Sequence, residues 1–350
     1  MKAKILLIGY GYWGKIWYKT IKSSKHQLVG VVDPIFKTTF SPLSENEITY
    51  DSLMNEDGSS VFNVKDDRLD FTHAIVAVPA MQHYKTYKQL KSMGIEDKNI
   101  LIEKPVGLNL KEATEMSECC HGLVWLYDKA YRNLRYLLKN KIIGDIVLYQ
   151  SFRASMGPRI RTDVSIIEDY LFHDLYLYLS LTNQFRNTIN EDIDINYCNL
   201  RKSFFRDHHN LIKPDTVSLS FTDQTRTVEM FSSWIYPKKE RKIVIVGTKG
   251  SLIWENDSIF INKSYYKKMD NCLSVDKYGN IGYELIEAIS VSPEIDKTFT
   301  SNLELLLDDF VGNTLEIGDD IIPTSTFKTK QKKLVINTHR LIEKIKNIRD

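Results

Sequence analysis

Cysteine is scarce in this sequence of 350 residues, which contains only four. Cys119 and Cys120 are adjacent, whereas Cys198 and Cys272 each stand alone, so none belongs to a C-x-x-C pair of the kind that binds zinc or works in redox exchange. Cysteine usage of this kind favours a reduced, cytoplasmic compartment. We predict no metal site.

Net charge and long apolar runs are also missing. The 47 basic and 45 acidic residues leave a formal net charge of +2, which gives no global field to hold the chain on nucleic acid or an anionic membrane. The first apolar run, Ile5–Ile8, is too short for a signal peptide or a membrane span, and glycines follow it at once. We therefore expect neither nucleic acid nor a membrane as a partner, and we expect any nucleotide to bind in a local site.

From Lys4 to about Pro105, short apolar runs alternate with longer polar stretches that are compatible with helices. Each run is continuous, as expected of a parallel strand that is covered on both faces. The runs are Ile5–Ile8, Leu28–Val32, Ala74–Val78 and Ile100–Ile102. Asn109 then has the position of a helix N-cap, with Glu112 three residues on, and predicts a helix that ends near Cys120. The alternation predicts a doubly wound α/β sheet.

Beyond about residue 124 the pattern changes, and 350 residues are enough for two domains with separate cores. Helical segments are predicted at Lys129–Asn140, Ile166–Leu181 and in the basic tail from 330 to 350. The β-type runs are Ile146–Phe152, Val217–Phe221, Thr227–Trp234, Lys242–Val246 and Ser251–Trp254. Short turns at 222–225 and 247–250 read as hairpin connections. We predict domains at 1–124 and 125–350, the second an α/β domain with a large, mostly antiparallel open sheet.

An open sheet of this kind leaves one face available to a partner. The apolar alternation of Val217, Leu219 and Phe221 suggests that an apolar patch lies on that face. We therefore expect a homodimer or homotetramer that is built through the C-terminal sheet.

The segment after the first strand has the pattern G-x-G-x-x-G, formed by Gly9, Gly11 and Gly14, with Tyr12 and Trp13 between the last two. The glycines permit a tight turn, a close approach of the backbone to a pyrophosphate, and close packing of helix on strand. The following helix would direct its N–H groups at the phosphates. The first domain is therefore predicted to be a dinucleotide-binding Rossmann domain.

Asp33 ends the second strand, about twenty residues after the glycines, where a carboxylate accepts hydrogen bonds from the adenosine ribose. Its negative charge would repel a ribose 2′-phosphate, so we predict NAD as the cofactor. NADP stays possible, because Lys37 and Thr38 are close enough in sequence to contact a phosphate. The alternative for Asp33 is a turn-forming Asp-Pro.

Further motifs resemble those of a known family. Glu103-Lys104-Pro105, after the strand Ile100–Ile102, resembles the E-K-P signature of the Gfo/Idh/MocA oxidoreductases. Ala77-Val78-Pro79 with His83 resembles the cofactor-side loop of that family, and 157–163 with Asp169-x-x-x-His173-Asp174 resembles its catalytic segment. The segments 234–238, 246–250 and the helix expected near 302–311 are similar to the C-terminal half of members acting on sugars and nucleotide sugars. The resemblance implies an NAD(P)-dependent oxidoreductase in which Ala77, Val78, Pro79, His83, Glu103 and Lys104 contact the cofactor.

The predicted catalytic residues are Lys104, Asp169 and His173. Asp169 and His173 are four apart in a helical segment, so both side chains lie on one face. An imidazole can take the proton of a carbinol as hydride leaves, and the carboxylate can orient the imidazole or hold a neighbouring hydroxyl. Lys104, at the carboxyl end of a parallel strand, can stabilise an alkoxide or exchange the proton itself. An i,i+4 Asp and His can also form an ordinary surface ion pair.

Substrate contacts are predicted just before the catalytic helix. Arg153, Arg159 and Arg161 carry guanidinium groups suited to the diphosphate of a nucleotide sugar, with solvated surface charge as the alternative. Tyr131 could line the pocket, although core packing explains it equally well.

The leading hypothesis is hydride transfer between nicotinamide and a secondary carbinol or ketone of a sugar ring, for example oxidation of a 3-hydroxyl or reduction of a 3-ketone, with a nucleotide-linked sugar as substrate. One alternative is a lyase or glycosidase that cycles bound NAD. Another is a non-catalytic dinucleotide-binding regulator, against which the presence of Lys104, Asp169 and His173 together argues.

Overall fold

The computed structural model describes residues 2–34, 49–54, 71–156, 161–182, 193–203, 206, 210–255, 258–263, 287–291, 302–312 and 324–348. The chain forms two compact units, which are described separately. Unit 1 comprises Met1–Tyr127 and Phe299–Glu343, and unit 2 comprises Asp128–Thr298 and Lys344–Asp350. The packing thus groups 299–343 with the first unit, whereas the division at residue 124 stays a prediction about domains.

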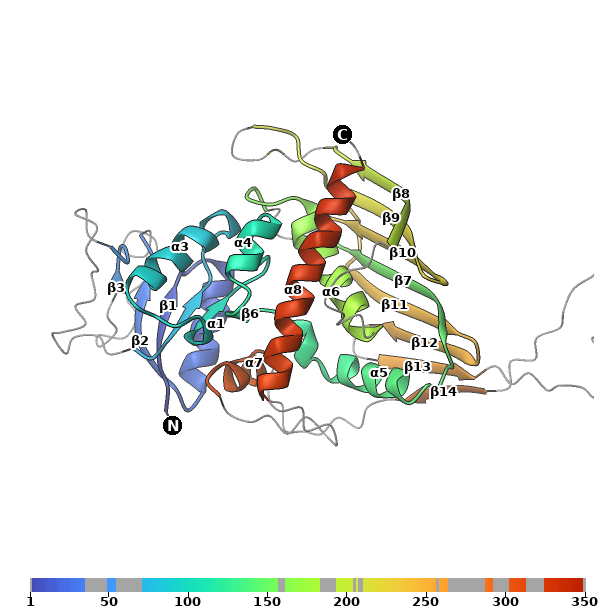
Figure 1. Cartoon of the computed structure of the whole chain (residues 1–350), viewed down its shortest axis with the longest axis horizontal. Helices are drawn as coiled ribbons and strands as arrows, with labels where there is room; N and C mark the ends of the chain where they lie inside the picture. Colours follow the sequence, from blue (N-terminus) through green and yellow to red (C-terminus); the bar gives the residue numbers. More distant parts are fainter. Residues whose placement is uncertain are drawn as a thin grey trace, which may run out of the picture. The chain divides into compact units, whose positions relative to one another are not determined.

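Unit 1 is built on a six-stranded parallel sheet (Figure 1). Its strands are β1 (Lys4–Ile8), β2 (Gln27–Val32), β3 (Thr49–Tyr50), β4 (His73–Val76), β5 (Ile100–Ile102) and β6 (Cys120–His121). They lie in the order β3-β2-β1-β4-β5-β6, which is the strand order of the Rossmann fold. The predicted doubly wound sheet is confirmed, and its four continuous apolar runs became β1, β2, β4 and β5.

Among its described residues, unit 1 contains three helices that come after strands of this sheet and two from the C-terminal part of the chain. They are α1 (Tyr12–Ser23), α3 (Ala80–Ser92), α4 (Leu110–Glu115), α7 (Asn302–Phe310) and most of α8 (Thr324–Asn347), with short 3-10 turns at Asp97–Asn99 and Val124–Tyr127. Asn109 caps α4 as predicted, because its side chain accepts a hydrogen bond from the Glu112 N–H at 2.9 Å. The expectation that this helix runs to Cys120 was wrong: α4 ends at Glu115, and Cys120 pairs with Leu101 in the sheet.

Unit 2 contains an eight-stranded sheet in the order β14-β13-β12-β11-β7-β10-β9-β8. Its strands are β7 (Ile146–Ala154), β8 (Ile193–Arg201), β9 (Thr216–Asp223), β10 (Arg226–Ser233), β11 (Glu240–Gly247), β12 (Gly250–Glu255), β13 (Ser258–Lys263) and β14 (Glu287–Val291). Neighbours pair antiparallel except β7 and β10. Both predicted hairpins are present, β9–β10 and β11–β12.

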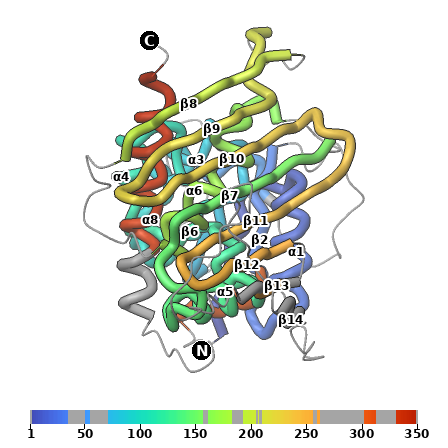
Figure 2. Tube along the Cα trace, turned by 90° about the vertical axis from the view of Figure 1, so that its right-hand side faces the viewer, coloured from blue at the N-terminus to red at the C-terminus, as the bar shows by residue number. Residues whose placement is uncertain are grey.

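Two helices cover one face of this sheet, and Figure 2 looks onto the opposite face. α5 (Lys129–Lys139) contacts β12 and β13, and α6 (Phe172–Leu181) contacts β7. A five-residue π-helical turn, Ile167–Leu171, leads directly into α6. Every residue of α6 is buried, so this helix forms the centre of the unit 2 core.

Val217, Leu219 and Phe221 predicted an apolar partner face, but they lie on the face of the sheet that the helices cover. Val217 and Phe221 are 0% exposed, and the Phe221 ring meets Tyr178 of α6 with centroids 5.4 Å apart. Alternation marked the two faces of β9 correctly but did not show which face the helices cover. The opposite face carries apolar residues elsewhere, with Phe152 of β7 and Phe231 of β10 stacked at 4.9 Å.

Candidate functional site

Two glycines of the predicted phosphate loop are required by backbone packing. Gly9 has φ +95°, and a Cβ there would lie 2.7 Å from the Ala77 carbonyl group. A Cβ on Gly14 would lie 2.1 Å from the Gly9 carbonyl oxygen. The first glycine therefore makes the turn and passes close to the loop after β4, and the third lets α1 pack on the turn.

The middle glycine is different, because a Cβ on Gly11 would meet nothing within 4 Å. Gly11 precedes α1 and provides no side-chain cap for it. The first N–H groups of α1 therefore have no side-chain cap at this N-terminus, and Tyr12, the first residue of the helix, is 59% exposed. This arrangement fits a pyrophosphate, whose oxygens would accept hydrogen bonds from the loop and helix N–H groups.

Asp33 is placed next to the same loop. Its Oδ2 accepts a hydrogen bond from the Tyr10 N–H at 2.6 Å, and its own N–H donates to the Tyr50 carbonyl at 2.8 Å. Asp33 therefore fixes the glycine turn from the end of β2. Lys37 and Thr38 lie outside the described residues.

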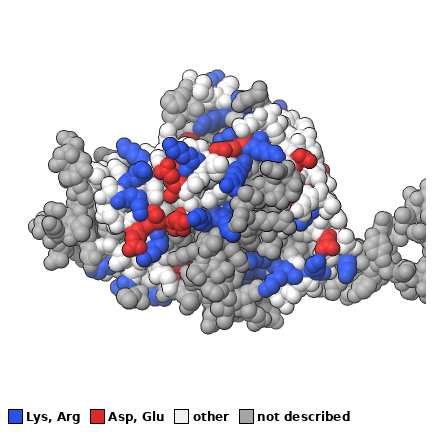
Figure 3. Space-filling model, viewed as in Figure 1, with Lys and Arg blue, Asp and Glu red and all other residues white. Residues whose placement is uncertain are grey.

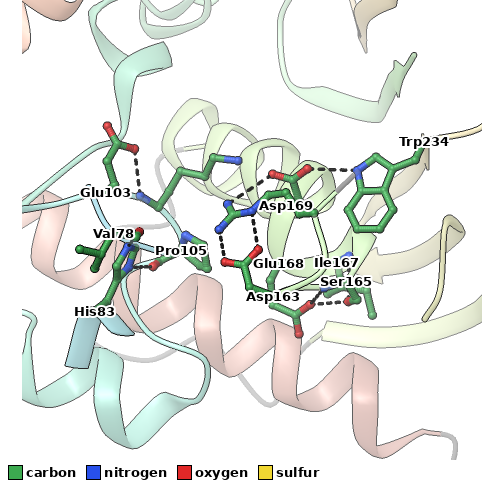
Figure 4. A network of polar contacts seen from close by, with 12 residues as sticks. Val78, His83, Glu103, Pro105, Asp163, Ser165, Ile167, Glu168, Asp169 and Trp234 are labelled. Carbon is green, nitrogen blue, oxygen red and sulfur yellow. Dashed lines mark hydrogen bonds and ion pairs between the residues drawn. The ribbon is translucent and has the colours of Figure 1, made fainter. Parts of the chain in front are cut away.

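The predicted cofactor-side loop, Ala77–Pro79, begins where β4 ends, at the carboxyl edge of the sheet. Behind it, the buried imidazole of His83 has Nε2 2.9 Å from the Val78 carbonyl oxygen and Nδ1 2.8 Å from the Pro105 carbonyl oxygen (Figure 4). Carbonyl oxygens only accept, so both contacts are hydrogen bonds when both ring nitrogens carry protons. His83 thus links this loop to the Glu103–Pro105 segment, and both of its ring nitrogens contact the backbone.

Glu103 and Lys104 are both buried at the end of β5. Glu103 Oε1 accepts a hydrogen bond from the Trp17 indole N–H of α1 at 2.7 Å, and Oε2 accepts from the Lys104 N–H at 3.2 Å. A Cβ on Gly122 would meet Glu103 Oε2 at 2.9 Å. The carboxylate of Glu103 therefore ties the glycine-turn helix to the backbone of Lys104.

In unit 2, Asp169 lies in the π-helical turn and is 7% exposed. Its Oδ2 accepts a hydrogen bond from the Trp234 indole N–H at 3.0 Å, and Arg161 Nη1 is 3.8 Å from Oδ1. Arg161 in turn forms a two-point ion pair with Asp163, at 3.0 and 2.6 Å (Figure 4). The indole and the guanidinium hold the Asp169 carboxylate in one orientation. π-Helical turns are frequent at functional sites.

His173 follows in the first turn of α6 and is also 7% exposed. Its Nδ1 lies 3.2 Å from the Tyr176 hydroxyl oxygen, and the two rings contact edge to face with centroids 5.6 Å apart. The hydroxyl can donate to Nδ1 or accept from it, so Tyr176 fixes the ring orientation and is coupled to the imidazole tautomer.

The predicted substrate residues are placed unequally. Arg153 is 6% exposed and paired with Asp174, whose Oδ1 lies 3.0 Å from Nε and 2.9 Å from Nη2. Burial raises the pKa of the Asp174 carboxyl, and the Arg153 guanidinium opposes that rise. Tyr131 is buried in the core, which favours its alternative interpretation as a packing residue. Arg159 lies outside the described residues.

Sequence reasoning missed the residues that hold the site residues in place. Trp17, Trp234 and Tyr176 are hydrogen-bond partners of Glu103, Asp169 and His173. The spacing of His173 and Tyr176, three apart on a helix, was a signal that could have been used. The two tryptophans are distant in sequence from their carboxylates, and no local pattern links them.

The strand order, the glycine turn and the acidic residue at the end of β2 define unit 1 as a dinucleotide-binding Rossmann domain. Residues 3–123 match the GFO_IDH_MocA family model, described as an oxidoreductase family with an NAD-binding Rossmann fold. The resemblance of its motifs to the Gfo/Idh/MocA oxidoreductases is confirmed over this domain, and the prediction of an NAD-type cofactor is confirmed with it. Comparison of the sequence with curated proteins found no match.

Solved structures with the same fold extend over nearly the whole chain. One is a UDP-N-acetylglucosamine 3-dehydrogenase, GnnA from Acidithiobacillus ferrooxidans, with 15% identity, TM-score 0.62, and coverage of 97% of this chain and 96% of that one. Another is GenD2 from gentamicin A biosynthesis in complex with NAD, with 14% identity, TM-score 0.63 and coverage of 97% and 93%. A third is a mutant of KijD10, a 3-ketoreductase from Actinomadura kijaniata in complex with TDP-benzene and NADP, with 10% identity, TM-score 0.63 and coverage of 97% and 98%. These likenesses confirm the fold class of both units.

Figure 3 shows Lys and Arg side chains interspersed with Asp and Glu on the face that it presents. Within the described ranges, no helix is both long enough and apolar enough to cross a membrane. The same residues contain no cluster of three or more His, Cys, Asp or Glu side chains that could hold a metal ion.

Proposed function

We propose that this oxidoreductase moves a hydride between nicotinamide and a secondary carbinol or ketone of a sugar ring, on a nucleotide-linked sugar. The observation that carries the proposal is the pair of buried residues, Asp169 and His173, each held by an aromatic partner on consecutive helical turns. A buried carboxylate and imidazole fixed in this way are suited to proton transfer and to holding a hydroxyl group.

NAD, when bound, supplies or accepts the hydride, and the chain provides everything else. The loop of Gly9, Gly11 and Gly14 holds the pyrophosphate, and Asp33 accepts hydrogen bonds from the adenosine ribose. We infer that Tyr12, Trp13 and the segments Ala77–Pro79 and Glu103–Lys104 complete the cofactor site. In this proposal His83 acts from behind, through the Val78 and Pro105 carbonyl groups.

Three residues divide proton transfer, substrate positioning and charge stabilisation among them. His173 takes the carbinol proton during oxidation and returns it during reduction, while Tyr176 holds the ring. Asp169 is held in place by Trp234 and Arg161 and accepts a hydrogen bond from a neighbouring sugar hydroxyl. The Lys104 ammonium group stabilises the negative charge that develops on the reacting oxygen.

The proposal of a nucleotide-linked sugar is supported by two similar folds, a UDP-N-acetylglucosamine 3-dehydrogenase and a 3-ketoreductase held with TDP-benzene. We assign the diphosphate to Arg159 and Arg161. Because Asp163 already occupies the fork of Arg161, a phosphate group there has to replace that carboxylate. Arg153 and Tyr131 are left out of this assignment, since one is ion-paired in the core and the other is packed there.

The test is turnover of a panel of nucleotide sugars and free polyols with NAD or NADH, followed by the nicotinamide absorbance. Lys104→Ala and His173→Ala should each lower kcat by about a hundredfold or more, with cofactor affinity much less affected. Asp169→Asn should do less harm if Asp169 only holds and orients groups. The double variant Lys104→Ala/His173→Ala should be far from additive. If both single variants keep normal turnover, this assignment is wrong; if no substrate is turned over while NAD binds, the regulator hypothesis is favoured.

A further inference from the structure

Glu168 precedes Asp169 in the π-helical turn and is a deeply buried carboxylate that the proposed reaction does not use. Its Oε2 accepts hydrogen bonds from the Ser165 N–H, at 3.0 Å, and from the Ser165 hydroxyl group (Figure 4). The Ser165 hydroxyl oxygen also accepts from the Ile167 N–H at 3.3 Å. Ser165 and Glu168 therefore form an S-x-x-E capping box that fixes the start of the turn.

A buried carboxylate needs a cation as well as hydrogen-bond donors. Lys346, in the last turn of α8, places its Nζ 2.5 Å from Glu168 Oε1. Two residues earlier on α8, the Lys344 ammonium group donates to the Ile193 carbonyl oxygen at the start of β8. Burial is the largest influence on the pKa of Glu168 and would raise it, but Lys346 and Ser165 together lower that pKa below its ordinary value.

Glu168 and Asp169 are consecutive, so the direction of one side chain constrains the other. Glu168 is held by Ser165 and Lys346, while Asp169 is directed at the Trp234 indole and at Arg161. If Glu168 lost its cation, it would move toward solvent and rotate the turn, and the Asp169–Trp234 hydrogen bond would lengthen.

We propose that Lys346 is a positioning residue for Asp169, acting through the capping box of Ser165 and Glu168. The proposal rests on the assignment of Asp169 to the reaction. The ion pair compensates the buried charge of Glu168, and the hydrogen bonds of the box transmit its position to the backbone of the π-helical turn.

The direct test follows the Trp234 indole N–H signal by NMR in protein labelled with ¹⁵N-tryptophan and saturated with NAD, with the signal assigned by Trp234→Phe. Lys346→Met should shift this signal, because its hydrogen bond to Asp169 changes. The Trp17 indole, which donates to Glu103 in unit 1, is an internal reference and should not move. Lys332→Met is the matched control: Lys332 is on the same helix but pairs with Glu118 at the surface of unit 1.

Compensating variants separate charge from simple loss of packing. Lys346→Arg should retain the wild-type signal. The double variant Glu168→Gln/Lys346→Met should return the signal toward its original position, since a neutral Gln accepts from the Ser165 N–H and needs no cation. It also supplies the measurement if Lys346→Met alone does not fold, because a double variant that folds with a displaced Trp234 signal would overturn the proposal. An unmoved signal in folded Lys346→Met would overturn it as well.

Activity then distinguishes this proposal from the proposed function. With UDP-N-acetylglucosamine as first probe, or whichever nucleotide sugar in the panel is turned over, Lys346→Met should lower kcat by about tenfold or more, the scale of a small misplacement. In the Asp169→Asn background the same change should have little further effect. Full additivity would contradict positioning through Asp169. If Asp169→Asn left kcat unchanged while Lys346→Met still shifted the Trp234 signal, the catalytic role of Asp169 would be refuted. The positioning of Asp169 by Lys346 would remain supported.

Discussion

The two glycines that differ most in their surroundings offer a sharp separation of stability from cofactor binding. Gly14→Ala would place a Cβ 2.1 Å from the Gly9 carbonyl oxygen and 2.8 Å from its carbon, where ordinary contact begins at 3.4 Å. Gly11→Ala would place a Cβ in open space, at a residue with φ −69°, which alanine adopts without strain. Gly14→Ala therefore disturbs packing, whereas Gly11→Ala only adds a methyl group in the space at the start of α1.

The magnitudes follow from these distances. To accept a Cβ at Gly14, α1 and the turn have to separate by roughly 1 Å, and overpacking of this kind costs about 1–3 kcal/mol. At about 2–4 °C per kcal/mol for a unit of this size, the Tm of the protein without cofactor should fall by several degrees. Gly11→Ala should change the free energy of unfolding by less than about 1 kcal/mol. It should weaken NAD binding by about tenfold or more, about 1.4 kcal/mol, because the methyl group would occupy the space that we propose for the pyrophosphate.

The assay is thermal unfolding without cofactor, combined with NAD titration by fluorescence, on both variants. Gly94→Ala is a control for steric space, since a Cβ there also meets nothing within 4 Å, although its positive φ of +82° should cost stability without affecting NAD. The reasoning would be refuted if Gly11→Ala bound NAD normally, or if Gly14→Ala left the Tm unchanged.

Three further predictions rest on single contacts. Asp33→Asn keeps an oxygen to accept from the Tyr10 N–H but loses the charge, so NAD should lose its advantage over NADP while the fold is retained; a wild-type preference for NADP in paired titrations would contradict the role of Asp33. A dimer or tetramer built on the free sheet face should dissociate when Phe152→Asp breaks its stack with Phe231, and light scattering that finds wild type monomeric at micromolar concentration would rule this out. The folded-state pKa of Glu168 lies below its ordinary value of 4.5, so its stabilising contribution is complete above pH 4.5 and is lost as the pH falls through the lowered pKa. The difference in the free energy of unfolding between wild type and Lys346→Met, measured in urea, should therefore be largest near neutral pH and should disappear in acid. A difference that is independent of pH would contradict the ion pair.

The parts of the fold that were predictable are those with local signatures. Parallel strands such as Ile100–Ile102 are buried on both faces and read as continuous apolar runs, and Asn109 with Glu112 formed the expected cap. Cys120 was assigned to a helix because nothing local distinguishes a two-residue strand that is held by its neighbour Leu101. The face of Val217 was misjudged, because alternation carries no information on where α6 packs.

In the candidate site too, local contacts could be predicted from the sequence and tertiary contacts could not. The Ser165–Glu168 capping box was readable from its spacing, although its place beside Asp169 gives it a meaning that spacing does not. Trp234 reaches Asp169 from the end of a strand sixty-five residues away, and Lys346 reaches Glu168 from another helix. Such contacts depend on tertiary packing, which no local pattern encodes. No local sequence pattern predicts the π-helical turn either.

Isotope transfer tests most directly whether this chain moves a hydride to or from a sugar ring carbon, as we propose. The protein is incubated with NADH carrying deuterium at both hydrogen positions of the nicotinamide C4 and with a panel of 3-keto nucleotide sugars, and the products are analysed by mass spectrometry and NMR. We predict one deuterium on the ring carbon that bears the new hydroxyl group, with one NAD formed for each sugar reduced, and loss of this product in His173→Ala. Absence of deuterium from every sugar, with NADH bound but unchanged, would contradict this proposal.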